Sequence, residues 1–483
     1  MQPISFHDFH PAPGCVVEWT VGADTFGAAR SAPADPVPAS YNQQLHLGSA
    51  RAAAAAGLPG NPWIGATFDI AGAADLGALE WAFTGWLRRH EALRSGFRQG
   101  AAGIERFTLS AAETALERGP GRVFSCPEAL HAHLDERFGA GTDPFAWPPL
   151  VLGVISRPAG STVFLAMDHV CGDGYSLALA VGELGSTYEA ALQRRDLVLP
   201  ETGSYLEQCT EERELGQAIS PDAPAVGQWR NFVRTCGGTT PTFPLDLGVE
   251  AGRTWPQSLY NRKMQSAEGA AAFAAVCEQA GGSLFAGLLA AMGLAVREIT
   301  GQEDFRTITP LHTRYKPRWR SAMGWFITCA PLDFSLAGTS SFAEVLPRAH
   351  SAVRSALRLS RYPAARVIEL LGDDFRVTRR DLFSMVSYTD YRTMPGADRY
   401  PDWNPLTIGE VSVADDTHVW VSRLHDGLHI GVRHPDTPVA AEVLDEYIAT
   451  IELVLSRVAA LGDYPVAPAW ACRPLPGCRV NTG

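Results

Sequence analysis

Two apolar runs, a glycine-rich turn and an amphipathic run follow one another between residues 150 and 192, and this succession constrains the fold more than any other feature of the chain. "LVLGVIS" at 150–156 and "TVFLAMD" at 162–168 read as strands, and the "RPAGS" between them predicts a hairpin-like connection. "YSLALAVGELGSTYEAAL" at 175–192 has the spacing of an amphipathic helix. Strands and helices in such close succession predict an α/β fold.

The rest of the N-terminal half continues this mixture. Residues 1–40 predict short strands and loops, because their prolines interrupt any helix. Residues 63–72 have strand composition, and 75–97 have apolar residues at helical spacing behind Asp75, a favourable N-cap. The Ala-rich stretch at 51–60 closes on Gly and Pro and is compatible with either a helix end or a mobile loop.

The second half repeats the pattern. Helices are predicted at 269–281, 283–301, 341–359 and 440–461, and strands at 305–314, 323–334, 382–392, 418–427 and 428–434. A chain of 483 residues is too long for one ordinary core, so two α/β sandwich lobes of similar size are expected. The polar segment at about 196–225 is the candidate crossover. We therefore expect an N-terminal lobe over 1–205, a C-terminal lobe over 206–470 and a surface tail over 471–483.

Composition narrows the class of protein. Hydrophobic residues make up 46% and charged residues 19% of the chain, which is typical of a soluble globular protein. The formal net charge of -12 argues against a nucleic-acid partner. The nine cysteines are scattered and form no C-x-x-C pair, so reduced thiols are expected rather than a disulfide framework or a zinc ribbon. No signal peptide and no membrane-spanning run is recognised, and we expect a cytoplasmic protein.

Several common catalytic motifs are missing from the sequence. There is no G-x-S-x-G elbow, no phosphate-binding G-x-x-x-x-G-K-[ST] loop and no H-E-x-x-H zinc helix. The histidine pairs in "FHDFH" at 6–10 and "HAHLD" at 131–135 could suggest a metal. Residues i and i+2 of a helix point in different directions, however, so surface histidines are the favoured interpretation.

The stretch "MDHVCGDG" at 167–174 is the best candidate site. His169 stands where a strand meets a glycine turn, and a neutral imidazole there can accept a proton from a hydroxyl or an amine. Asp173 can orient the loop, and with Ser176 it can serve the N-terminus of the following helix. From composition alone, a structural histidine in a tight turn is an equally good interpretation. A nucleophilic Cys171 beside His169 is a minor alternative, because no third group that would orient them is identified.

This stretch resembles the H-H-x-x-x-D-G motif of the condensation-domain superfamily, which includes chloramphenicol acetyltransferase, the condensation domains of nonribosomal peptide synthetases and free-standing polyketide-associated acyltransferases. Four further segments resemble family motifs and occur in the family order. They are "RRHEALRSGF" at 88–97, "DPFAWPPLVLG" at 143–153, "TPLHTRYKPRWRSAMGWFITCAPL" at 309–332 and "VSYTDYRTMPG" at 386–396. The resemblance spans nearly the whole chain.

The resemblance implies two chloramphenicol-acetyltransferase-like α/β sandwich lobes in a V, with an active-site tunnel between them. It implies a free-standing acyltransferase of secondary metabolism that forms an ester or an amide. The donor would be an acyl thioester on coenzyme A or on the phosphopantetheine of an acyl or peptidyl carrier protein, and the acceptor a small-molecule hydroxyl or amine. No permanently bound cofactor and no metal is implied, and a monomer is expected.

The resemblance also assigns roles to residues. His169 is the expected general base, and the N–H of Gly174 is expected to help stabilise an oxyanion. Asp173 is expected to be structural and to pair with Arg314, an arginine of the second lobe. Ser387, Trp325 and Tyr175 are candidate substrate contacts.

At one position the sequence departs from the motif, because Asp168 stands where the family has its first, mainly structural histidine. On a strand Asp168 would face away from His169. If it lay close, its charge would raise the pKa of His169, and activity would need a higher pH. Asp168 also supports an alternative function, a catalytically silent condensation-like domain that recruits a carrier protein or a partner enzyme. The retained His169, Asp173 and Gly174 argue against that alternative.

Overall fold

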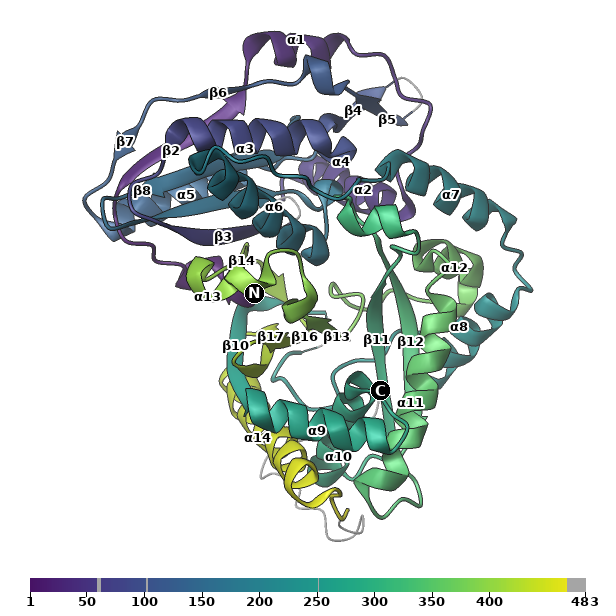
Figure 1. Ribbon diagram of the computed structural model, residues 1–483. Coiled ribbons are helices and arrows are strands. Elements are labelled where there is room, and N and C mark those ends of the chain that lie inside the picture. The colour runs from purple at the N-terminus through teal and green to yellow at the C-terminus, as the bar shows by residue number, and fades with distance from the viewer. Residues whose placement is uncertain (59–61, 101–102, 251, 467–483) are drawn as a thin grey trace. The chain divides into compact units, whose positions relative to one another are not determined.

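The computed structural model describes residues 1–58, 62–100, 103–250 and 252–466, and it has the mixed α/β architecture expected from the sequence (Figure 1). Its contacts divide the chain into two compact units. Unit 1 comprises Met1–Ala218, Arg314–Ile327 and Tyr391–Glu410, and unit 2 comprises the remaining described residues. The first break falls after Ala218, inside the polar segment 196–225, and two later segments return to unit 1. The expected tail at 471–483 lies outside the described residues.

Unit 1 is built on an eight-stranded sheet. In spatial order the strands are β1 (Gln2–Ser5), β14 (Leu406–Gly409), β3 (Ile64–Ala71), β9 (Gly160–Met167), β8 (Leu150–Ser156), β2 (Cys15–Val21) and β6 (Leu116–Arg118), and β7 (Arg122–Val123) also pairs with β2. β1 and β14 are parallel, whereas β3, β9, β8 and β2 pair antiparallel in succession. The hairpin-like connection expected between the two apolar runs is thus the antiparallel pair β8–β9.

The strand that leads to the candidate site is covered on both faces, which explains its uninterrupted apolar sequence. Val163, Leu165 and Met167 of β9 pack in one hydrophobic cluster with helices α3 (Leu76–Arg89) and α6 (Gly174–Leu192). Phe164 and Ala166 point into a second cluster with α5 (Pro127–Gly141). The end of β9 is therefore fixed by packing from both sides.

The helix predicted over 75–97 is shorter in the structure. Asp75 caps α3 as expected, but α3 ends at Arg89, and after the short helix α4 (Glu91–Arg94) the chain enters β4 (Ser95–Gly100), which pairs with β5 (Gly103–Thr108). His90 interrupts the helix with an extended backbone, φ -101° and ψ 114°. Its imidazole is buried and bonds the Glu183 carboxylate of α6 at 2.7 Å. This tertiary contact outweighs the helical periodicity of the segment.

Four helices of unit 1 lie where no helix was predicted. They are α1 (Ala23–Ser31), α2 (Tyr41–Ala55), α7 (Tyr205–Ala218) and α13 (Tyr400–Trp403). α1 ends directly before the proline-rich stretch, which is how the interval 1–40 accommodates a helix. α2 begins at a capping box of Ser40 and Gln43, and its last turn shows that the Ala-rich stretch is a helix end.

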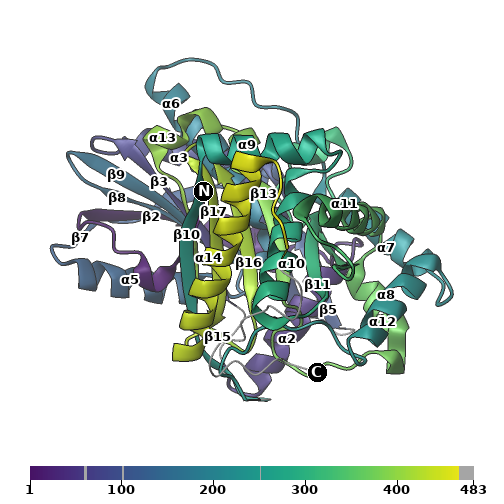
Figure 2. The same cartoon turned by 90° about the horizontal axis from the view of Figure 1, so that it is seen from below.

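Unit 2 carries a seven-stranded sheet covered by helices. The strand order is β12 (Ile327–Ser335), β11 (Asp304–His312), β13 (Met385–Asp390), β16 (His418–Leu424), β17 (Gly427–Pro435), β10 (Trp255–Ser266) and β15 (Val413–Ala414). The helices are α8 (Pro224–Thr235), α9 (Ala267–Gln279), α10 (Leu284–Thr300), α11 (Phe342–Leu359), α12 (Ala364–Leu371) and α14 (Pro438–Leu461). Figure 2 shows α14 lying in front of the strands beside α9 and α10, which it contacts.

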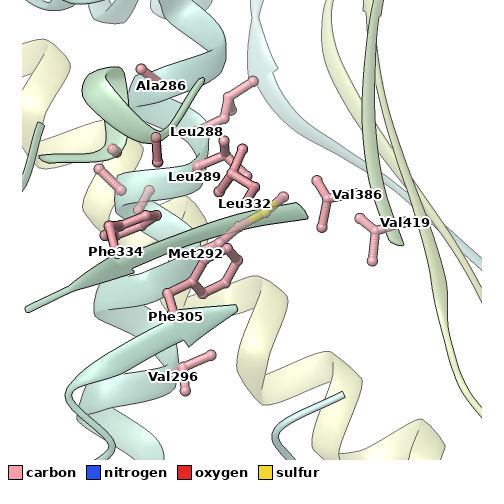
Figure 3. Close-up of a cluster of buried hydrophobic side chains, with 14 of the residues drawn as sticks. Ala286, Leu288, Leu289, Met292, Val296, Phe305, Leu332, Phe334, Val386 and Val419 are labelled. Atoms are coloured by element: carbon pink, nitrogen blue, oxygen red, sulfur yellow. The ribbon is translucent and has the colours of Figure 1, made fainter. Parts of the chain in front are cut away.

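The core of unit 2 forms between α10 and this sheet. Leu289 and Met292 of α10 lie beside Leu332 of β12 and Phe305 of β11 (Figure 3), in the same hydrophobic cluster as Leu288. α10 is apolar almost all round because it is buried almost all round. The helices and strands predicted for this half are present, but β10, β15, α8 and α12 were not predicted.

Two chemical expectations can be compared with the described residues. Seven cysteines lie there, and all seven are free. Within the same residues no single helix is long and apolar enough to cross a membrane, and α9 and α10 pass that test only as a pair bent by 98°.

Candidate active site

The site is built on the turn between β9 and α6 in unit 1. β9 ends at Met167, and residues His169–Cys171 form a 3-10 helix for which Asp168 is the N-cap, its carboxylate accepting a hydrogen bond from the Val170 N–H at 2.8 Å. Two residues later Asp173 caps α6 in the same way, accepting from the Ser176 N–H at 2.8 Å. Each of the two carboxylates thus caps the helix that follows it.

This local structure corrects two expectations that assumed an extended strand. Asp168 does not alternate with His169 across a sheet, because the strand has ended before it. Cys171 does not stand beside His169 as a residue i+2 of a strand would. Cys171 is 1% exposed, and burial raises the pKa of its thiol, so the thiolate needed for nucleophilic attack is disfavoured.

His169 is held in one tautomer by the turn. Its Nδ1 lies 3.1 Å from the carbonyl oxygen of Gly172, which can only accept, so Nδ1 carries the proton and Nε2 keeps its lone pair. Burial and, next, the neighbouring His46 lower the pKa of His169 to about 4, and the opposing effects of Asp168, Gly172 and Asp173 are smaller. His169 is therefore neutral at pH 7 and able to accept a proton at Nε2.

Asp168 does lie close to His169, but its influence is outweighed. Its carboxylate is 1% exposed and is bonded by Nε2 of His46, on α2, at 2.9 and 2.8 Å to its two oxygens. Asp168 raises the pKa of His169, as the sequence suggested, yet burial and His46 lower that pKa further. The expected need for a higher pH is therefore not what the structure indicates.

Asp173 and Arg314 form a buried pair. The Arg314 guanidinium donates to both carboxylate oxygens of Asp173, at 2.8 and 3.0 Å, and the two side chains are 1% and 2% exposed. Burial alone would raise the pKa of Asp173, but the charge and hydrogen bonds of Arg314, with those of Ser176, hold it below its ordinary value. The segment Arg314–Ile327 belongs to unit 1, so the pair lies within that unit rather than joining it to the second lobe.

The segment that carries Arg314 also reaches α6 through Ser176. The Ser176 hydroxyl donates to the carbonyl oxygen of Gly324 at 3.0 Å and accepts from the Gly324 N–H at 3.2 Å. Gly324 has a φ of +149°, and a Cβ there would meet the ring of Tyr205 at 2.3 Å, so only glycine fits. This contact places the next residue, Trp325, against the site.

Trp325 and Tyr175 contact different residues of the site. The Trp325 ring stacks on His169, with centroids 4.6 Å apart and planes at 26°. The Tyr175 hydroxyl donates to the carbonyl oxygen of Arg320 at 3.1 Å, and its ring lies 4.3 Å from the Arg314 guanidinium carbon. Of the two candidate contacts, Trp325 touches the catalytic candidate, and Tyr175 supports the pair behind it.

Gly174 and Ser387 complete the predicted set. Gly174 is the first residue of α6, is exposed, and a Cβ there would meet no protein atom within 4 Å. Its N–H is one of the donors that a helix start leaves without an intrahelical partner. Ser387 lies in unit 2, on β13 opposite Trp420, and is not among the side chains that unit 1 gathers around His169.

Sequence reasoning missed His46 and underrated Ser176. A signal for α2 existed, since Ser40 and Gln43 have the spacing of a capping box. Nothing in the sequence indicated that α2 would lie against a turn more than a hundred residues away.

Other candidate sites remain apart from this cluster. His10 and His131 approach each other, with ring centroids 5.2 Å apart, but the described residues contain no group of three or more potential metal ligands. A cavity of about 630 Å³ lies in unit 2, beside Asp415 and Asp416, and none of the predicted site residues lines it.

Comparisons with known proteins extend over nearly the whole chain. A family model described as the condensation domain matches residues 63–412. The 2'-acyl-2-O-sulfo-trehalose (hydroxy)phthioceranyltransferase PapA1 of Mycobacterium tuberculosis is 29% identical over 461 residues, covering 94% of this chain and 88% of the relative. Trehalose-2-sulfate acyltransferase PapA2 of the same species is 28% identical over 461 residues, covering 94% and 97%.

Solved structures of similar fold include an acyl transferase and a domain from teicoplanin biosynthesis. The PapA2 acyl transferase has a TM-score of 0.87 at 26% identity and covers 95% of this chain and 100% of its own. The X-domain from teicoplanin biosynthesis has a TM-score of 0.67 at 19% identity, with coverages of 92% and 99%, and indicates a shared fold.

Proposed function

The chain belongs to the condensation-domain family and is an acyltransferase, and on this premise we propose that it transfers an acyl group from a thioester to a hydroxyl or amine acceptor, with His169 as the general base. One observation carries the proposal. The Nδ1–H of His169 is bonded to the Gly172 carbonyl oxygen, which leaves Nε2 as a proton acceptor on a neutral ring.

The chemistry follows from that lone pair. Nε2 takes the proton from the acceptor group as its oxygen or nitrogen attacks the thioester carbonyl carbon. The tetrahedral intermediate carries its negative charge on the former carbonyl oxygen, and the N–H of Gly174 at the start of α6 is suited to stabilise it. When the intermediate collapses, the carbon–sulfur bond breaks and the thiolate takes the proton back from His169.

The acceptor we propose is a hydroxyl, and specifically a sugar hydroxyl. The two relatives named for trehalose sulfates cover most of this chain, and their names describe acyl transfer to such molecules. The missing Cβ at Gly174 leaves space beside the turn for a substrate to approach the helix start. The donor is a thioester of coenzyme A or of a carrier-protein phosphopantetheine, and the same His169 chemistry serves both.

The silent-domain alternative loses its main support in this site. The Asp168 carboxylate has defined hydrogen-bond partners, because it is bonded by His46 and by the Val170 N–H. In the same turn His169 is bonded to the Gly172 carbonyl oxygen, and Asp173 is paired with Arg314.

The proposal is tested by presenting the purified protein with a panel of acyl-coenzyme A donors and matched acyl-carrier proteins. Trehalose, trehalose 2-sulfate and a primary amine serve as acceptors, and products are detected by mass spectrometry. We expect an O-acylated sugar with at least one donor class and faster turnover with the sugars than with the amine. An amide as the main product would overturn the choice of acceptor, and no product across the panel would overturn the proposal.

A further inference from the structure

Helix α2 holds the catalytic turn at two points. The Gln43 side-chain amide donates to the carbonyl oxygen of Val170 at 2.8 Å, and His46 bonds the carboxylate of Asp168. Residues three apart lie on the same face of a helix, so both contacts come from one side of α2. The two turn residues that they grip, Asp168 and Val170, stand directly before and after His169.

The His46–Asp168 contact is well defined chemically. An ionised carboxylate only accepts hydrogen bonds, so Nε2 of His46 is the donor toward both oxygens of Asp168, at 2.9 and 2.8 Å. Asp168 is 1% exposed, and the His46 side chain is 10% exposed. A carboxylate buried to this degree is costly unless it is paired, and His46 supplies that pairing.

His46 also lies against the reacting ring. Its centroid is 6.2 Å from that of His169, and Trp325 contacts both rings, stacked on His169 at 4.6 Å and edge-on to His46 at 5.3 Å. The three rings form one packed group. A displacement of His46 is therefore passed to His169 both through Trp325 and through the turn.

We propose that His46 and Asp168 act as one positioning unit for His169, in which the imidazole missing from the first motif position is supplied from α2. This inference rests on the proposed function for the role of His169, but its structural part does not. The pair fixes the turn that carries His169 and sets the charge beside its ring. His46 is a positioning residue, since it acts through His169.

The groups around His169 make the sign of this effect predictable. α2 contributes His46, and the turn contributes Asp168, the buried thiol of Cys171 and Asp173, the cap of α6. The segment 314–327 contributes Arg314, which is engaged by Asp173. Burial and His46 lower the pKa of His169, whereas Asp168 and Asp173 raise it. Removing His46 should therefore raise this pKa, and removing the charge of Asp168 should not.

The test titrates His169 directly in the full-length protein labelled with ¹³C at the histidine Cε1 positions. His169→Ala identifies the signal by its loss. In His46→Ala we expect the pKa of His169 to rise by about one unit or more, because a buried carboxylate loses its partner. In Asp168→Asn it should not rise. His429→Ala, which breaks an exposed His–Asp pair in unit 2, is the matched control and should leave His169 unchanged.

Kinetics supply the second readout. His46→Ala should lower kcat about 10- to 100-fold with little change in the KM of the thioester, because His169 is displaced from its working position. The acid limb of its pH profile should move to higher pH. A wild-type His169 that titrates near pH 6.5, or a folded His46→Ala protein with unchanged His169 pKa and kcat, would overturn the inference. The titration needs no substrate, so it can succeed even if the proposed acyl transfer fails.

Discussion

At the scale of single residues, the two carboxylates of the motif turn both act as N-caps, but their side-chain partners differ. Asp168 caps the 3-10 helix His169–Cys171 and Asp173 caps α6, yet Asp168 is bonded by an imidazole and Asp173 by a guanidinium. The Arg314 guanidinium carries a permanent charge, so Asp173 has an ionic partner, whereas the partner of Asp168 is the N–H of the His46 imidazole.

The lowered pKa of His169 predicts a pH dependence of stability. An unfolded histidine binds a proton near pH 6.5, but folded His169 does so only near pH 4. The unfolded state thus gains a proton first as the pH falls, and the stability is complete above about pH 6.5 and is lost toward pH 4. The effect is on the order of 3 kcal/mol before solvent screening reduces it.

This dependence is measured by urea unfolding at several pH values in wild type and in His169→Ala. The variant should lose less stability between pH 6.5 and 4 than the wild type does. Parallel curves for the two proteins would contradict the assignment, since other buried histidines contribute equally to both.

Cys171 is predicted to be a packing residue. Because its thiol is buried and its pKa is raised, it should not react with a thiol reagent in the native protein. Cys171→Ala should keep turnover within a few-fold of wild type and should lose about 1 kcal/mol of stability, as an ordinary core substitution does. Loss of activity in a stably folded variant would reopen the nucleophile interpretation.

At the scale of elements, the site is the meeting point of α2, α6 and the segment 314–327. Much of α6 and of the β8–β9 pair could be predicted, because each of these elements has a periodic apolar pattern within its own segment of the sequence. The break at His90 could not be predicted, since it depends on the buried Glu183 of α6. For the same reason the position of His46 could not be predicted, because the distance along the chain to Asp168 says nothing about contact.

The candidate site residues could likewise be identified from local motifs, but their contacts with distant segments could not. His169, Asp173 and Arg314 come from motifs whose residue order is informative, and the structure brings these three together. Ser387 comes from a motif whose strand lies in unit 2. A motif identifies a residue, but only the fold shows which other residues surround it.

Arg314 is predicted to contribute strongly to stability. Arg314→Ala leaves the carboxylate of Asp173 buried without its cation, which should cost about 3–5 kcal/mol and lower the melting temperature. Arg306→Ala, which removes a partly exposed pair with Asp304, is the control and should cost no more than about 1 kcal/mol. Equal melting temperatures for the two variants would show that the buried pair is not needed for stability.

At the scale of the whole molecule, unit 1 is assembled from three separate stretches of chain. β14 lies between β1 and β3, and it comes from the segment Tyr391–Glu410. Arg314 and Trp325 come from another late segment. The two units are therefore not consecutive in the sequence. A division of the chain at one point assigns the two late segments of unit 1 to the wrong unit.

This arrangement predicts the behaviour of a fragment. Residues 1–218 alone would lack β14 and Arg314, leaving the edges of β1 and β3 unpaired and Asp173 without its cation. We expect the fragment to show no cooperative thermal transition by circular dichroism, while the full chain shows one. A fragment that melts cooperatively at the temperature of the full chain would contradict the role given to the late segments.

The role of His169 as general base is tested most directly by acyl transfer in His169→Ala under single-turnover conditions, with the donor and acceptor on which the wild type is fastest. We predict a loss of about 10²- to 10⁴-fold in the rate of the chemical step, with an unchanged melting transition at pH 7 and unchanged thioester binding. A folded His169→Ala protein that transfers the acyl group at the wild-type rate would contradict it.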